Sequence, residues 1–188
     1  MKETAVAFKR SASLATALDM FGIDVTLLVE GEHSGDQLAI AEYVSRPGLE
    51  PPPHCHEYDD EIFYILEGSF EAYCGHQVIE VRQGECLFLP CGKPHAWIIQ
   101  TPKLRTLIVA RPAGMGKPFR SLRVLKNGVP KSAATRDDDT ISDDRILKLS
   151  TENSIRILTH EEIAIKMPQF PLRSQPWPPK RRASLIDS

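Results

Sequence analysis

The strongest constraint on the fold is a series of short runs, from residue 25 to about residue 112, in which apolar and polar side chains alternate. Such alternation is typical of strands with one buried face, and Gly, Pro or Asp residues that favour turns separate the runs. Because no helical period interrupts the series, the pattern predicts an all-β fold, a small antiparallel barrel or jelly roll. The expected strands are 25–30, 37–45, 61–66, 69–74, 77–82, 86–89, 96–100 and 104–110.

The regions that flank the expected barrel differ from it in composition. Residues 1–24 form an N-terminal arm with a short helix expected at 14–20, and such arms often cover a barrel edge or a partner subunit. Residues 113–188 form a C-terminal extension with an acidic connector, a helix expected at 144–152, a short extended piece and a proline-rich tail. The sequence therefore predicts three regions, with the barrel at 25–112.

Three histidines and one glutamate fall at positions that predict a metal site. His54 and His56 lie two residues apart, so on an extended chain their imidazoles point to the same side. Glu61 opens the next expected strand, which we expect to return antiparallel after a polar turn at 58–60. His95 enters a third strand through a turn shaped by proline and glycine. Three nitrogens and one oxygen suit one divalent transition metal (iron, manganese, nickel, cobalt, copper or zinc) better than calcium or magnesium.

The spacing of these residues resembles the two sequence motifs of the cupin superfamily. The chain matches them as Gly48-x5-His54-x-His56-x4-Glu61-x6-Gly68 and Gly84-x5-Pro90-x-Gly92-x2-His95. The resemblance implies a double-stranded β-helix, or cupin jelly-roll barrel, in which His54, His56, Glu61 and His95 are the metal ligands. The second motif often ends in Asn where this chain has Ile99, which changes pocket polarity and leaves the ligands intact. Over residues 20–160 the chain is also loosely similar to small single-domain cupins described as quercetin 2,3-dioxygenase-like.

The substrate pocket is expected beside the ligands, because side chains on one face of a strand point into the same space. The residues that alternation nominates for this pocket are Phe63, Ile65, Trp97 and Ile99. An apolar, partly aromatic pocket of this kind fits a flat, modestly polar organic molecule. The strand at 37–45 has two alternative inward faces, which are Ala39, Ala41 and Tyr43 or Leu38, Ile40 and Glu42.

Three hypotheses about function follow from the resemblance and from the residues. The leading one is an enzyme, a metal-dependent dioxygenase-type oxidoreductase that uses dioxygen and Glu61 as catalytic base on a small apolar or aromatic compound with a hydroxyl or enol group. The second is a metal-dependent, non-oxidative isomerase, lyase or cyclase, in which the ion acts as a Lewis acid. The third is a non-catalytic small-molecule-binding cupin. Anaerobic turnover distinguishes the first two, and binding without chemical change identifies the third.

Charge and cysteine pattern narrow the expected partners and location. A net charge of −2 gives no reason to expect nucleic acid, and no apolar run approaches the roughly 20 residues of a membrane helix. The N-terminus lacks signal-peptide features and the four cysteines form no CxxC pair, so we expect a cytoplasmic protein with reduced thiols. Cys55 should face away from the metal, and His33, His76 and His160 are expected at the surface. The resemblance and the arm favour a homodimer.

Overall fold

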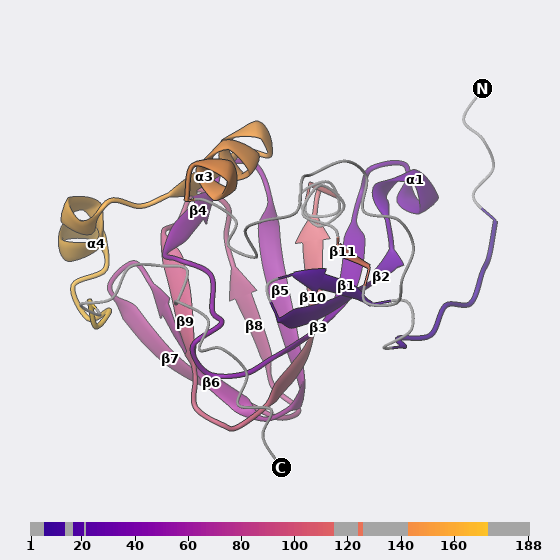
Figure 1. Cartoon of the computed structure of the whole chain (residues 1–188), viewed down its shortest axis with the longest axis horizontal. Coiled ribbons are helices and arrows are strands. Elements are labelled where there is room, and N and C mark those ends of the chain that lie inside the picture. The colour runs from indigo at the N-terminus through magenta and orange to yellow at the C-terminus, as the bar shows by residue number, and fades with distance from the viewer. Residues whose placement is uncertain (1–5, 14–16, 21, 115–123, 126–142, 173–188) are drawn as a thin grey trace, which may run out of the picture.

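The computed structural model describes residues 6–13, 17–20, 22–114, 124–125 and 143–172. These residues form two antiparallel sheets that face each other (Figure 1), which confirms the predicted all-β jelly roll, a double-stranded β-helix. In order across the larger sheet, the strands are β11 (Val124–Leu125), β1 (Leu18–Met20), β2 (Ile23–Val29), β3 (Ala39–Ser45), β10 (Leu104–Arg111), β5 (Asp60–Glu67) and β8 (Cys86–Leu89). In the smaller sheet they are β12 (Ile155–Ile157), β4 (His54–His56), β9 (His95–Ile99), β6 (Ser69–Cys74) and β7 (Gln77–Arg82).

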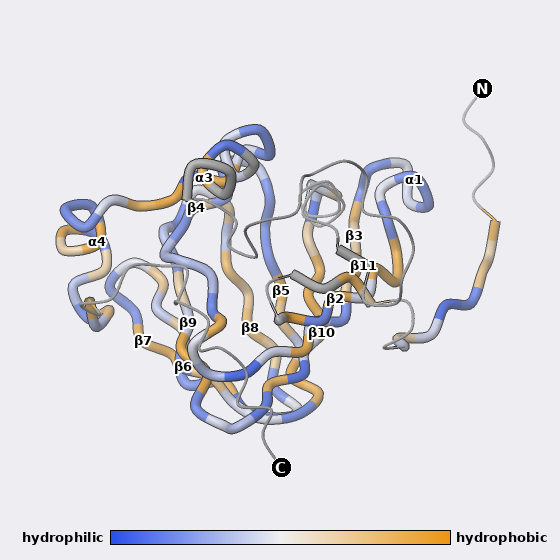
Figure 2. The backbone as a smooth tube through the Cα atoms, in the orientation of Figure 1, coloured by the Kyte–Doolittle hydropathy of each residue, from blue (hydrophilic) through white to orange (hydrophobic). Residues whose placement is uncertain are grey.

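The core lies between the two sheets and takes side chains from both. Apolar residues lie along the strands, as Figure 2 shows, and their inward faces form one buried cluster. Phe63 of β5 packs against Phe70 of β6, with ring centroids 5.7 Å apart, and against Trp97 of β9 at 5.1 Å. On β3 the buried residues include Ala39, Ala41 and Tyr43, which decides between the two faces that the sequence left open.

The hairpin of β6 and β7 follows the prediction closely. Ser69 pairs with Arg82 and Cys74 with Gln77, so Gly75 and His76 form a two-residue turn. Gly75 has a φ of 57°, in the left-handed region that such a turn requires.

Strand β1 replaces the last part of the helix that the sequence predicts at 14–20. Leu18–Met20 pairs antiparallel with β2, and residues 14–16 of the expected helix lie outside the described residues. Leu18 lies opposite Val25 and both side chains are buried in the core. Sheet pairing and burial therefore outweigh the local helical pattern, as tertiary context commonly does. Because β1 pairs with β2, β11 with β1 and β12 with β4, residues on both sides of 25–112 extend the sheets.

Helices occupy the outside of the sheets. Helix α3 (Asp143–Glu152) agrees with the expected helix at 144–152, and β12 is the extended piece that follows it. Helix α4 (His160–Lys166) was not expected, although Thr159 and Glu162 form a capping box that signals a helix start in sequence. Its Ile163 packs against the outer face of the smaller sheet. A single helical turn, α1 (Gly31–Ser34), separates β2 and β3, where no helix was expected. Among the described residues, no helix has the length and apolar character needed to cross a membrane.

Gly68, between β5 and β6, is a glycine whose substitution should be poorly tolerated. Its φ is +84°, and a Cβ atom there would overlap the Lys103 carbonyl oxygen and lie 2.5 Å from Thr101 Oγ1. We expect Gly68→Ala to lower the free energy of unfolding by about 2 to 4 kcal/mol, since backbone strain and overpacking add. Gly84→Ala is the matched control, because Gly84 has the same φ of +84° with open space around the Cβ position. Urea denaturation of both variants tests this, and equal losses would contradict the steric argument.

Candidate metal centre

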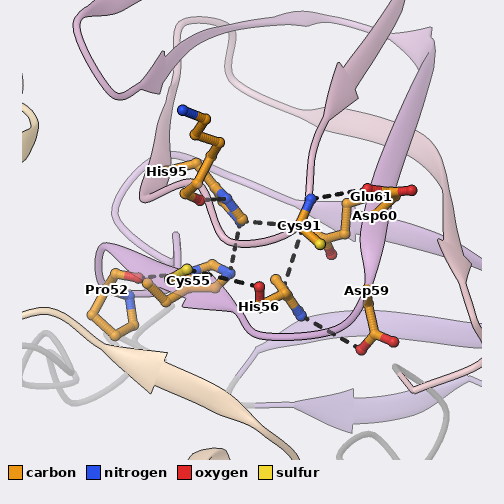
Figure 3. Close-up of polar contacts among 10 residues, drawn as sticks. Pro52, Cys55, His56, Asp59, Asp60, Glu61, Cys91 and His95 are labelled. Atoms are coloured by element: carbon orange, nitrogen blue, oxygen red, sulfur yellow. Dashed lines mark hydrogen bonds and ion pairs between the residues drawn. The ribbon is translucent and has the colours of Figure 1, made fainter.

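Four donor side chains meet inside the barrel. Each offers one ligand atom, and these atoms lie within 4.8 Å of one another; the residues are His54, His56, Glu61 and His95. All four side chains are buried. His54 and His95 are direct partners across β4 and β9, which brings their rings to 4.5 Å between centroids. The structure thus brings together every residue that the sequence predicts as a metal ligand. Figure 3 labels three of them, His56, Glu61 and His95.

Glu61 reaches the cluster by a different route from the predicted one. The sequence suggested that the strand of Glu61 returns antiparallel beside the strand of the two histidines. In the structure, β4 lies in the smaller sheet and β5 in the larger one, where Glu61 pairs with Leu89 and Ala110. The carboxylate therefore faces the imidazoles across the barrel interior. Alternation fixed the face of Glu61 correctly, but it carries no information about which strand is the neighbour.

Each of the three imidazoles turns Nδ1 outward and Nε2 into the cluster. His54 Nδ1 lies 2.8 Å from the Pro52 carbonyl oxygen, and His95 Nδ1 lies 2.9 Å from the Lys93 carbonyl oxygen. A carbonyl oxygen only accepts, so both Nδ1 atoms carry the proton and donate. In the neutral rings, both Nε2 atoms then present a lone pair, which is the tautomer that metal-binding histidines use.

The inner atoms have no protein partners that satisfy them. His54 Nε2 and His95 Nε2 are 3.2 Å apart, and neither has a proton to share when both Nδ1 atoms donate outward. Glu61 Oε2 lies 3.5 Å from His56 Nε2 and 3.4 Å from His95 Nε2, and the Glu61 and His56 atoms make no hydrogen bond in the described structure. Buried polar atoms without a partner are costly. A cation at the centre of these atoms would satisfy all of them, so the four candidate ligands fit a metal ion.

Electrostatics within the cluster favour the deprotonated forms of His54 and Glu61. Burial lowers the pKa of His54 well below its usual value, and the neighbouring His95 and His56 lower it further. Burial alone would raise the pKa of Glu61, but the three histidines outweigh it and lower that pKa to about 2. A neutral imidazole and an ionised carboxylate are the protonation states that bind metals.

Asp59 is a buried group near the cluster that the sequence analysis did not single out. Its Oδ2 lies 3.9 Å from Nδ1 of His56, the outer nitrogen of the third imidazole (Figure 3). Burial would lower the pKa of His56, and the carboxylates of Glu61 and Asp59 outweigh it and raise that pKa. A carboxylate behind a ligand histidine orients its ring. The signal in sequence was weak, because Asp59 sits in a polar turn that otherwise indicates exposure.

The residues nominated for a pocket lie in the buried core of the barrel. Phe63, Ile65, Trp97 and Ile99 are all buried in the main core cluster. Among the four nominated side chains, Trp97 contacts a candidate ligand through its ring, whose centroid lies 5.9 Å from that of His54. Contact of these side chains with a substrate stays a prediction.

The four cysteines and the other three histidines lie outside the cluster. All four cysteines are free. Cys55 is opposite Arg156 of β12, and burial raises the pKa of its thiol. His76 and His160 are exposed, as expected. His33 is half-buried beside Glu30 and Glu32, a second group of possible donors, but Arg10 already pairs with Glu30 at 3.1 Å.

Comparison with known proteins finds a family match within the barrel segment. Residues 42–109 match the family model described as "Cupin domain", and this segment contains all four donors. An uncharacterized protein of Methanocaldococcus jannaschii, MJ1618, is 30% identical over 69 residues, which cover 37% of this chain and 55% of that protein. The chain thus spans about half the length of this curated relative.

Solved structures that are similar to this chain have varied descriptions. The polyketide cyclase RemF from Streptomyces resistomycificus is 28% identical, with 56% of this chain and 80% of that chain covered and a TM-score of 0.46. A predicted oxalate decarboxylase from Thermotoga maritima is 23% identical, with 48% and 80% covered and a TM-score of 0.45.

Proposed function

We propose that this chain, whose residues 42–109 match the cupin family, binds one divalent transition-metal ion and acts as an oxygenase on a small apolar or aromatic compound with a hydroxyl or enol group. The proposed ligands are His54, His56, Glu61 and His95. One observation carries the proposal: imidazole lone pairs and a carboxylate oxygen converge on one buried point without protein partners. Iron, manganese, nickel, cobalt, copper and zinc all suit these four ligands.

The chain contributes binding and proton transfer around the ion. When bound, such an ion supplies Lewis acidity and, if it is redox-active, a path for electrons between an organic substrate and dioxygen. Glu61 is the one carboxylate among the four proposed ligands, and the histidines keep it ionised by lowering its pKa, so it is the group placed to accept the proton of a substrate hydroxyl. Phe63 and Trp97, buried beside it, keep water away and provide apolar surface for a ring.

Glu61→Gln tests the proposed role of this carboxylate. We expect the variant to retain much of the metal, because three imidazoles remain, and to lose at least about 100-fold in turnover, because an amide cannot accept the proton. The assay is oxygen uptake by metal-reconstituted protein with a panel of phenolic and enolic compounds. Glu57→Gln is the matched control, since Glu57 is exposed and outside the cluster.

The outcomes separate the proposed oxygenase from its alternatives. If turnover continues at the same rate without oxygen, the protein is a non-oxidative isomerase, lyase or cyclase and the oxygenase hypothesis is wrong. Ligand binding without chemical change in every metal form would indicate a binding protein. Unchanged oxygen uptake in Glu61→Gln would remove Glu61 as base. The homodimer and the cytoplasmic location also stay predictions.

A further inference from the structure

Three polar side chains in the barrel core have no hydrogen-bond partner among the residues that the structure describes. Their unpaired atoms are Tyr43 Oη, Ser45 Oγ and Trp97 Nε1, which we call the donor set. Tyr43 and Ser45 are each 4% exposed and Trp97 is 5% exposed. Native proteins pair nearly all of their buried polar atoms, because an unpaired one carries its full desolvation cost. Three such atoms in one interior therefore point to a partner that is not part of the chain.

Neighbouring polar groups in the same interior are satisfied, so the donor set is not a general feature of this core. Thr106 is the cross-strand partner of Tyr43, and its hydroxyl donates to the Tyr64 carbonyl oxygen at 2.9 Å. Glu50 is buried and accepts from the backbone N–H groups of Gly48 at 2.7 Å and Ile99 at 2.9 Å. The fold thus pairs purely structural polar groups and leaves the donor set unpaired.

The residues of the donor set come from both sheets of the barrel, and Trp97 is the one beside the candidate metal centre. Tyr43 and Ser45 share the inward face of β3 with Ala39 and Ala41, whose small side chains take little of the interior volume. Ser45 is the polar neighbour of the Tyr43 hydroxyl, but neither makes a hydrogen bond of acceptable geometry. Trp97 stands on β9 in the opposite sheet, with its ring 5.9 Å from that of His54.

The chemistry of the donor set selects for an acceptor. The indole N–H of Trp97 can only donate, and the hydroxyls of Tyr43 and Ser45 each offer one O–H. Burial, together with the negative charges of Glu50 and Glu61, raises the pKa of Tyr43, so its hydroxyl keeps the proton. A hydrocarbon beside these groups would leave them unpaired, whereas an oxygen with free lone pairs would accept a hydrogen bond from the donor that it reaches.

We propose that the donor set binds a second oxygen of the substrate, a carbonyl or ether oxygen apart from the hydroxyl or enol group that faces the metal centre. This inference rests on the proposed function, because it places the substrate in the same barrel interior. It narrows the substrate class to compounds with two oxygen functions, such as hydroxyaryl ketones. It also assigns Tyr43, Ser45 and Trp97 as residues that determine specificity.

A pair of probes that differ by one carbonyl oxygen tests the inference. We compare 4-hydroxyacetophenone with 4-ethylphenol by calorimetric titration of wild type loaded with zinc and of metal-free wild type. We expect the ketone to bind at least about 10-fold more tightly, because only the ketone pairs the donor set. Tyr43→Phe and Ser45→Ala should each reduce this preference by about 3-fold or more without lowering the melting temperature, since each removes an unpaired polar atom.

Thr106→Val is the matched control, because it deletes a buried hydroxyl that is already paired. It should lower the melting temperature and keep the ketone preference. Equal binding of the two probes, no binding of the ketone, or a preference unchanged in both variants would overturn the inference. Melting temperatures of Tyr43→Phe and Ser45→Ala that fall as far as that of Thr106→Val would assign the hydroxyls to structural hydration instead. Binding is measured without turnover, so it tests the inference separately from the proposed oxygenase activity. A protein that prefers the ketone but consumes no oxygen would refute only the oxygenase. A protein that consumes oxygen but binds both probes equally would refute only the inference.

Discussion

His95→Ala is expected to abolish stoichiometric metal binding. Wild type should hold close to one divalent transition-metal ion per chain after reconstitution, and the dissociation constant should rise by at least about 100-fold in the variant. Loss of an outer partner of a ligand commonly costs 10- to 100-fold, and loss of the ligand itself should cost no less. His95 is 1% exposed and its Nε2 lies 3.2 Å from that of His54, so no other imidazole nitrogen can take its place without rearrangement.

Elemental analysis and competition with a chromophoric chelator measure this effect. His76→Ala is the matched control, because His76 is exposed in the β6–β7 turn, and it should bind metal as wild type does. Metal should also raise the melting temperature of wild type, since a ligand at 100 times its dissociation constant stabilises by about 2.7 kcal/mol. That rise should be absent in His95→Ala. Wild-type protein that stays free of metal after reconstitution, or a variant that keeps its ion, would refute the proposed site.

Phe70→Ala is expected to cause the largest loss of stability, about 3 to 5 kcal/mol in the free energy of unfolding. Phe70 is 1% exposed on β6, and its ring packs against those of Phe63 at 5.7 Å and Trp97 at 6.4 Å. It therefore stands where the two sheets meet. Removing the ring leaves a cavity that the paired strands on both sides cannot close. The variant therefore loses the free energy of burying the ring and also bears the cost of the cavity.

Phe88→Ala is the control for this substitution. Phe88 is 56% exposed on β8, and its truncation should change the free energy of unfolding by less than about 0.5 kcal/mol. Urea denaturation of metal-free protein gives both values without a contribution from bound metal. Similar losses in the two variants would show that Phe70 does not hold the sheets together as the packing indicates.

The sequence was most informative where a pattern repeats with period two. The strands from β5 to β10 lie within one residue or so of the expected runs, because alternation reports burial on one face. It was least informative at the ends of the chain. The sequence predicts a helix where the structure has β1 and predicts none at α4, because such short elements depend on the surface they pack against. The expected proline-rich tail at 173–188 lies outside the described residues.

Local features of the sequence were enough to predict the class of the fold and four candidate metal ligands, because strand periodicity and residue type are local properties. The packing of the two sheets was needed to show that Glu61 comes from the sheet opposite the histidines and that Asp59 is buried behind His56. It also decided that the polar atoms of Tyr43, Ser45 and Trp97 have no partner. Period two fixes the face of a strand toward which a side chain points, whereas the neighbour across that face depends on how the two sheets close over each other.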